Sequence, residues 1–259
     1  MSDNQYEYNG VDIVPKDVVH VSIKEGITLI PHSTFYECHN LESVTISSTV
    51  TKIDYAAFYD CVSIETITLP SSIKEIEELT FSSCVSLYST DIPNGLKRIN
   101  CFTFESCTNL DKIIIPSSVT EIGQGAFYGC CNLKSISSLS KGTKIKHGAF
   151  IGCKMLCSLD LSIDIEYIGI GLFEGCKSLL NIDLYSGKKK YTVRLLHFGL
   201  IFGRVRFQSD GITKILEKHY SFLDETDPIY GMYPFLLAVC TPWKGIWNTK
   251  NYNEKEHLD

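Results

Sequence analysis

Apolar residues recur with a period of 23 along residues 18–185, without insertion or deletion. Each unit carries a Phe, a Cys three residues later, and a Leu or Ile three residues after that. The phenylalanines are Phe35, Phe58, Phe81, Phe104, Phe127, Phe150 and Phe173. A unit of this length cannot bury its apolar side chains alone, so successive units must stack and share a core. The pattern therefore predicts a solenoid.

Each unit also predicts one short strand. Pairs such as Val44 and Ile46, or Ile113 and Ile115, are separated by a single outward residue, which is typical of a strand with one buried face. Thr90 and Ser138 replace an apolar residue, so their two rungs should be weaker. We expect eight rungs from residue 18 onward, forming a stack about 40 Å long. Phe104, at the middle of the stack, should be the most damaging single residue to truncate.

The whole unit, A-F-x-x-C-x-x-L-x-x-I-x-I-P-x-x-V-x-x-I-x-x-x, resembles the BspA-type leucine-rich repeat. Ala57-Phe58, Ala126-Phe127 and Ala149-Phe150 match its A-F pair, whereas Thr34, Thr80, Thr103 and Leu172 depart from Ala. The resemblance covers roughly residues 11–185. It implies an α/β repeat solenoid, with short parallel strands and loose or short-helical convex turns, used mostly for protein recognition. The family occurs in bacterial surface proteins and in unicellular eukaryotes, and the resemblance implies no catalytic residues.

Seven of the eleven cysteines form one column of the repeat. They are Cys38, Cys61, Cys84, Cys107, Cys130, Cys153 and Cys176. The simplest interpretation is a buried row of small apolar side chains. Disulfides along the column are disfavoured because parallel Cβ vectors give a poor torsion. A metal site is also disfavoured, since the sequence has no C-x-x-C motif and no histidine pair at metal-ligand spacing.

The outward positions of the strands are the predicted binding surface, because repeat proteins of this shape usually bind on the concave strand face. Many of these positions are Ser or Thr, as in any solvated strand face. The sharper hypothesis is a shallow acidic groove for a basic or extended polypeptide, with Tyr88 as its aromatic anchor. The candidate residues are Glu42, Glu65, Tyr88, Asp91, Asp111, Asp160 and Asp183.

Catalysis is not predicted. A repeat places like side chains in rows, whereas an active site needs unlike reactive groups converging in a pocket. The sequence contains no nucleophile elbow, P-loop, dinucleotide fingerprint or zinc-protease motif. We therefore expect a binding module or scaffold with no catalytic residues, no cofactor and no metal.

The charge of the chain changes sign after the repeats. Residues 1–185 contain 13 Lys and Arg against 22 Asp and Glu, while residues 186–259 contain 11 against 8. The basic residues of the segment 186–210 are Lys188, Lys189, Lys190, Arg194, Arg204 and Arg206. We expect alternating stretches such as 191–195 and 205–207 to cap the open end of the stack. A basic patch for nucleic acid or an anionic surface is the alternative.

Four segments are predicted in total: a lead-in at 1–17, the solenoid at 18–185, the basic closing segment at 186–210 and a helical C-terminal cap with a tail at 211–259. The cap rests on apolar residues spaced three and four apart, beginning at Ile212. The chain is 44% hydrophobic and its first residues show no secretory signal pattern, and no apolar run is long enough to span a bilayer. We expect a cytoplasmic protein; a surface-exposed adhesin or host-interaction protein is the alternative if the true N-terminus is missing.

Overall fold

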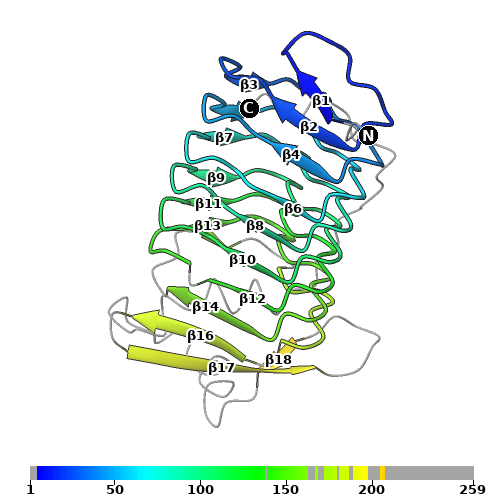
Figure 1. Ribbon diagram of the computed structural model, residues 1–259. Coiled ribbons are helices and arrows are strands. Elements are labelled where there is room, and N and C mark those ends of the chain that lie inside the picture. Colours follow the sequence, from blue (N-terminus) through cyan, green and yellow to red (C-terminus); the bar gives the residue numbers. More distant parts are fainter. Residues whose placement is uncertain are drawn as a thin grey trace, which may run out of the picture.

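The computed structural model describes residues 5–137, 139–162, 167–168, 172–179, 181–186, 189–197 and 205–207. Figure 1 shows a stack of similar coils, one above the next, and this confirms the predicted solenoid. The described residues contain no helix, so of the two forms expected for the turns the structure has the loose one. The predicted helical cap at 211–259 lies outside the described residues.

The first row of strands follows the predicted alternation. After an initial strand β1 (Gln5–Tyr8), this row consists of β2 (His20–Ile23), β4 (Ser43–Thr45), β6 (Thr66–Ile67), β8 (Ser89–Asp91), β10 (Lys112–Ile114), β12 (Ser135–Ile136), β14 (Ser158–Ser162) and β16 (Asn181–Ser186). The row is divided into two sheets between β4 and β6, and paired neighbours from β1 to β16 are parallel. Lys112, for example, pairs with Ser89 on one side and Ser135 on the other. Partners along the row thus differ by the 23 residues of the repeat, so the coils stack in register.

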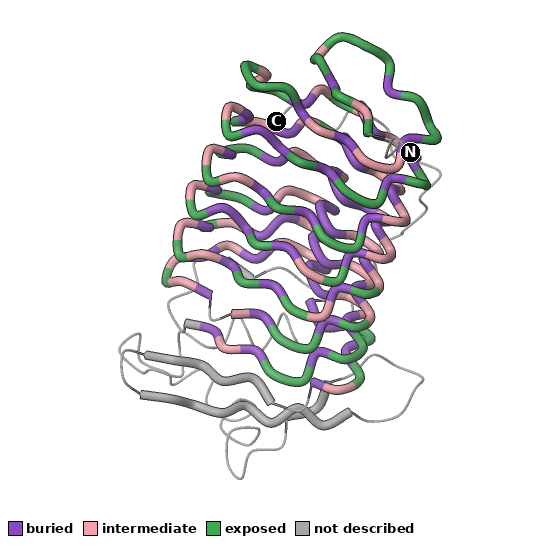
Figure 2. The backbone as a smooth tube through the Cα atoms, in the orientation of Figure 1, coloured by how far each residue is buried: buried purple, intermediate pink, exposed green. Residues whose placement is uncertain are grey.

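A second row of strands was not expected from the sequence. It is built from two-residue strands, each ending at the isoleucine that precedes the next Phe: β3 (Leu29–Ile30), β5 (Lys52–Ile53), β7 (Glu75–Ile76), β9 (Arg98–Ile99), β11 (Glu121–Ile122), β13 (Lys144–Ile145) and β15 (Tyr167–Ile168). They form two sheets, β3-β5-β7 and β9-β11-β13-β15, and within each sheet the strands are parallel and in register. Each coil therefore has two hydrogen-bonded strands, and Figure 2 shows the buried positions recurring from coil to coil.

The phenylalanines form one continuous column inside the stack. Consecutive rings from Phe35 to Phe173 lie with their centroids 4.9–5.8 Å apart and their planes within 3–14° of parallel. Tyr8, on β1, packs edge-on against Phe35 and covers the N-terminal end of the column. The 23-residue spacing thus places each ring directly against the rings of the coils before and after it.

The cysteine column contributes hydrogen bonds as well as apolar bulk. The Cys107 thiol donates to the carbonyl oxygen of Phe81 in the preceding coil at 3.1 Å, and that of Cys130 donates to Phe104 at 3.0 Å. The same contact occurs from Cys61, Cys84, Cys153 and Cys176. Each carbonyl also accepts the backbone N–H of the cysteine in its own coil, as Phe81 does from Cys84 at 3.2 Å. A carbonyl oxygen has two lone pairs, so the cysteine thiol, a weak donor, can bond to the one that the backbone N–H leaves free.

Two residues of each Phe–Cys turn have a left-handed backbone. One precedes the Phe by two residues and the other follows it by two, as at Ser33 (φ 54°) and Glu37 (φ 54°). The second position is Ser106 in the fourth turn and becomes Gly129 in the next coil. This geometry directs alternate N–H groups toward the next coil, so that Phe35 N–H donates to Ala57 and Glu37 N–H to Tyr59, each at 2.8 Å. The turns are therefore hydrogen-bonded along the stack like the strands.

The threonines that replace Ala before the Phe are also explained. Thr80 and Thr103 are buried, and their hydroxyls donate to the carbonyl oxygens of Glu77 (2.6 Å) and Asn100 (2.8 Å), three residues earlier.

At the C-terminal end, β17 (Lys189–His197) pairs antiparallel with β16, and β18 (Val205–Phe207) pairs antiparallel with β17. The parallel stacking thus ends where the repeat ends.

Candidate functional site

The outward side of the first strand row holds the predicted binding residues. We call this surface the strand face; within the described side chains its candidate residues are Glu42, Glu65, Tyr88, Asp91, Asp111 and Asp160. Glu42, Glu65, Tyr88 and Asp91 are exposed, whereas Asp111 and Asp160 are half-buried. Asp183 pairs in register with Asp160, and only its backbone is described. The stacking therefore places the candidates in two neighbouring columns. One column, just before the strands, holds Glu42, Glu65, Tyr88 and Asp111, and the other, within the strands, holds Asp91, Asp160 and Asp183.

Two apolar side chains are exposed at the middle of the strand face. Tyr88, just before β8, is 50% exposed, and Ile114, at the end of β10, is 58% exposed. Ile114 pairs in register with Asp91, which places a carboxylate beside the isoleucine. The alternation of β10 indicated that Ile114 points outward, yet an isoleucine in a strand-forming sequence is usually taken as core. Ile114 is thus a candidate contact that sequence reasoning had left out.

The negative charge of the strand face is only partly neutralised. Lys134 forms an ion pair with Asp111, with 2.6 Å between Nζ and Oδ1. Among the described residues, Glu42, Glu65 and Asp91 form no ion pair with Lys or Arg. At one end of the face, Nδ1 of His20 lies 2.9 Å from the hydroxyl of Ser43. The middle of the face thus combines two apolar side chains with unpaired carboxylates.

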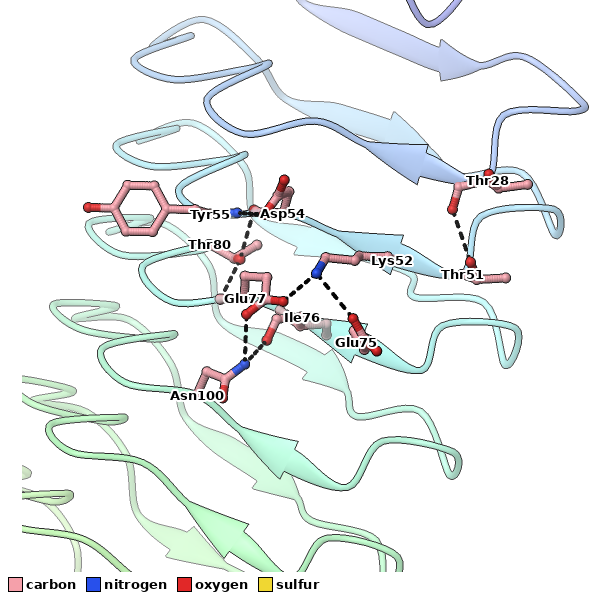
Figure 3. A network of polar contacts seen from close by, with 10 residues as sticks. All are labelled: Thr28, Thr51, Lys52, Asp54, Tyr55, Glu75, Ile76, Glu77, Thr80 and Asn100. Carbon is pink, nitrogen blue, oxygen red and sulfur yellow. Dashed lines mark hydrogen bonds and ion pairs between the residues drawn. The ribbon is translucent and has the colours of Figure 1, made fainter. Parts of the chain in front are cut away.

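The second strand row presents a charged surface of another kind. Lys52, Glu75, Arg98, Glu121 and Lys144 occupy one column, so the sign of the charge alternates from coil to coil. Lys52 bridges Glu75 at 3.1 Å and Glu77 at 2.5 Å, and Asn100 donates to Glu77 and to the Ile76 carbonyl (Figure 3). Hydrogen bonds to Glu77 and Glu75 raise the pKa of Lys52. Around Lys52 this surface is neutralised by ion pairs between its own residues, whereas on the strand face Asp111 is the only carboxylate among the described residues that forms an ion pair with a lysine.

The cysteines are poorly suited to nucleophilic chemistry. The ten cysteines in the described residues are free thiols, and the seven of the column are buried. Burial raises the pKa of Cys61, Cys84 and Cys107 well above the ordinary thiol value, and raises that of Cys101 to about 11. The thiolate is the reactive form, so these side chains are inert at neutral pH. In the part of the chain that is described, no three His, Cys, Asp or Glu side chains gather as a metal site would require.

The predicted basic patch is described only in part. The structure gives the backbone of β17, which contains Lys189, Lys190 and Arg194, and of β18, which contains Arg206. Lys188 and Arg204 lie outside the described residues. The patch therefore stays a prediction. Among the described residues, no helix has the length and apolar character needed to cross a bilayer.

Comparison with known proteins agrees with this architecture. Residues 16–130 and 80–195 match the family described as the BspA type leucine rich repeat region, in six copies. The crystal structure of a T. pallidum leucine-rich repeat protein is 33% identical, covers 68% of this chain and 78% of its own, and superposes with a TM-score of 0.54. A leucine-rich cell surface protein from Faecalibacterium prausnitzii is 25% identical over 67% of this chain and 61% of its own, with a TM-score of 0.38. No curated protein matches.

Proposed function

The chain belongs to the BspA-type leucine-rich repeat family, and from this premise we propose that it is a non-enzymatic protein-interaction module. Its proposed ligand is an extended, basic segment of a partner protein, which binds along the strand face. The protein acts by presenting a rigid surface, in the manner of a scaffold, and carries out no chemistry. The family is one of repeat proteins that generally lack enzymatic activity.

One observation carries the proposal: Tyr88 and Ile114, in neighbouring coils, are both exposed and have unpaired carboxylates next to them. Exposed apolar side chains surrounded by polar ones are typical of interface centres, and tyrosine is enriched among residues that dominate binding energy. By strand geometry the two positions lie about 11 Å apart, a span of three to four residues of extended polypeptide. Glu65 and Asp91 flank them and favour a positively charged ligand.

Affinity purification followed by mass spectrometry tests the strand face directly. The variant Tyr88→Ala with Ile114→Ser should lose the partner that the unaltered chain recovers, because it removes the apolar centre. A second variant, with Asp91, Asp160 and Asp183 changed to Lys, should lose the same partner through charge repulsion. Tyr55→Ala is the matched control, since Tyr55 is also a tyrosine, 42% exposed, but lies in a turn. Equal recovery by all variants would exclude the strand face.

We further propose that this binding takes place in the cytoplasm. The free thiols of the described residues support a reducing compartment, because cysteine-rich extracellular proteins usually pair theirs. BspA-type proteins are often surface-associated, so an adhesin or host-interaction role is the competing outcome. Cell fractionation with an antibody to the native protein separates the two, since an adhesin must be accessible on intact cells.

A further inference from the structure

The Phe–Cys turns of the first five coils carry negative charge with little to balance it. We call residues 31–40, 54–63, 77–86, 100–109 and 123–132 the turn edge. The turn edge contains six Asp and Glu residues and no Lys or Arg. Lys52 neutralises Glu77 from the neighbouring strand row. Within the described residues the other five carboxylates form no ion pair with Lys or Arg, and the Asp60 carboxylate lies 2.9 Å from Nε2 of His39.

Two tyrosines stack on this edge. Tyr36 and Tyr59 directly follow the Phe of consecutive coils, and their rings lie 4.9 Å apart with planes 7° from parallel. Both side chains are half-buried and so present part of each ring to solvent. In the next two coils Ser82 and Glu105 occupy the same column. The ring pair is therefore followed by a hydroxyl and a carboxylate, and the Ser82 hydroxyl donates to Glu105 at 3.1 Å.

The carboxylates lie close enough to act on the rings. Burial and then the charge of Glu37 raise the pKa of Tyr36. Burial, followed by the charges of Glu105 and Asp60, raises the pKa of Tyr59. Burial also raises the pKa of Glu105. The two rings thus stand in a field of negative charge, which adds to the attraction that a ring face exerts on a cation.

One cation already occupies this position. The ammonium group of Lys16, from the loop before β2, lies 5.7 Å from the centroid of the Tyr36 ring. It also donates a hydrogen bond to the backbone carbonyl of Tyr36. Lys16 covers only the N-terminal end of the stack, because Tyr36 belongs to the first of the five turns. It shows the mode in which the edge holds a basic side chain.

We propose that Tyr36, Tyr59 and the carboxylates of Glu37, Asp60 and Glu105 form a second binding surface, which takes an arginine-rich segment of a partner protein. Guanidinium groups stack on aromatic rings and pair with carboxylates in a fixed geometry, so arginine suits this surface better than lysine. The surface lies in the turns, apart from the strand face. It therefore stands or falls independently of binding at Tyr88 and Ile114.

Fluorescence anisotropy with labelled octa-arginine and octa-lysine peptides tests the proposal. Neutralising the edge with Glu37→Gln, Asp60→Asn and Glu105→Gln should weaken octa-arginine binding about tenfold at low salt. Asn is chosen at position 60 because Asp60 has φ 57°, which Asn tolerates. The matched control neutralises three exposed carboxylates of the strand face through Glu42→Gln, Glu65→Gln and Asp91→Asn. If the control weakens binding as much as the edge variant, the peptide senses net charge and the proposal is wrong.

Two further variants give results that misfolding cannot imitate. Tyr36→Leu with Tyr59→Leu should abolish the preference for octa-arginine over octa-lysine while leaving the charge unchanged. Lys16→Gln should tighten octa-arginine binding by about two- to fivefold, because it removes the internal competitor. Lys24→Gln is the control, because Lys24 is exposed and its substitution removes the same charge away from the tyrosines. Equal tightening by both lysine variants, or an unchanged preference in the tyrosine variant, would overturn the assignment.

Discussion

Truncation of Phe104 to Ala should unfold the centre of the stack. Its side chain is fully buried and stacks on Phe81 at 5.5 Å and on Phe127 at 5.6 Å. Loss of apolar contact together with the cavity left behind costs about 3–5 kcal/mol for a buried Phe. The expected loss for Phe104→Ala is at the upper end of that range, because the substitution also removes two ring contacts. Each aromatic pair contributes about 0.5–1.5 kcal/mol beyond its buried area. Small domains are stable by only about 5–15 kcal/mol, so the variant should be at or near the limit of folding.

Urea unfolding followed by far-UV circular dichroism measures this loss. Phe104→Leu should lose less than the alanine variant, because it retains apolar bulk and gives up only the ring contacts. Phe173→Ala is the second comparison, since among the described rings Phe173 stacks on Phe150 alone. It should cost about 1 kcal/mol less than Phe104→Ala. Equal losses at the two positions would refute the argument that the column is stabilised by neighbouring rings.

A double-mutant cycle refines the same test. Truncations at Phe81 and Phe104 should interact by about 0.5–1.5 kcal/mol, because these rings touch. Truncations at Phe58 and Phe104 should be additive, since a full coil separates them. Coupling between the distant pair that equals coupling between the adjacent pair would contradict nearest-neighbour stacking.

Three further predictions concern single residues. When the native protein is treated with iodoacetamide, mass spectrometry should find the exposed Cys157 modified first and the buried Cys107 modified only after unfolding; early labelling of Cys107 would contradict its burial. Modification of Cys101 should increase as the pH approaches about 11, where its thiolate forms. Lys52→Met should lower the free energy of unfolding by less than about 1 kcal/mol. Because the pKa of Lys52 is raised in the fold, this contribution should be fully present below about pH 10.4 and should decline above it, disappearing as the pH rises through the raised pKa; urea titrations at several pH values would show this. Gly129→Ala should cost about 1–2 kcal/mol in the same assay because Gly129 has φ 73°, whereas Ser106→Gly, at the same position one coil earlier, should be neutral or stabilising.

The repeat made the fold predictable, because a period repeated in register leaves only one way to bury the Phe, Cys and Leu columns together. The same spacing predicted which strand residues pair between coils. The structure confirms this pairing, for example between His20 and Ser43 and between Ser135 and Ser158. The second strand row was missed because two-residue strands produce no alternation that a sequence pattern can reveal. Their only signal was the isoleucine column with a charged residue before it in most coils.

The candidate site was less predictable than the fold. Alternation placed Asp91 on the outward side of its strand, and Asp91 is exposed. Glu42, Glu65 and Tyr88 come just before the strands, and their exposure follows from the turn there and not from alternation. The ion pair of Lys134 with Asp111 depends on side-chain conformation, which a sequence pattern does not determine. The tyrosine stack could have been found, since Tyr36 and Tyr59 are one repeat apart. Lys16, which lies outside the repeat, could not be placed beside them by any period.

By itself the sequence determined that the chain stacks in 23-residue coils and which residues share each column, because burial of a recurring apolar set is decided by spacing alone. Only the tertiary structure decided that the cysteine thiols donate to the phenylalanine carbonyls of the preceding coil, and that alternate turn residues take a left-handed backbone. These features depend on where one coil places its polar atoms against the next. That arrangement is a property of the assembled stack, and no single repeat contains it.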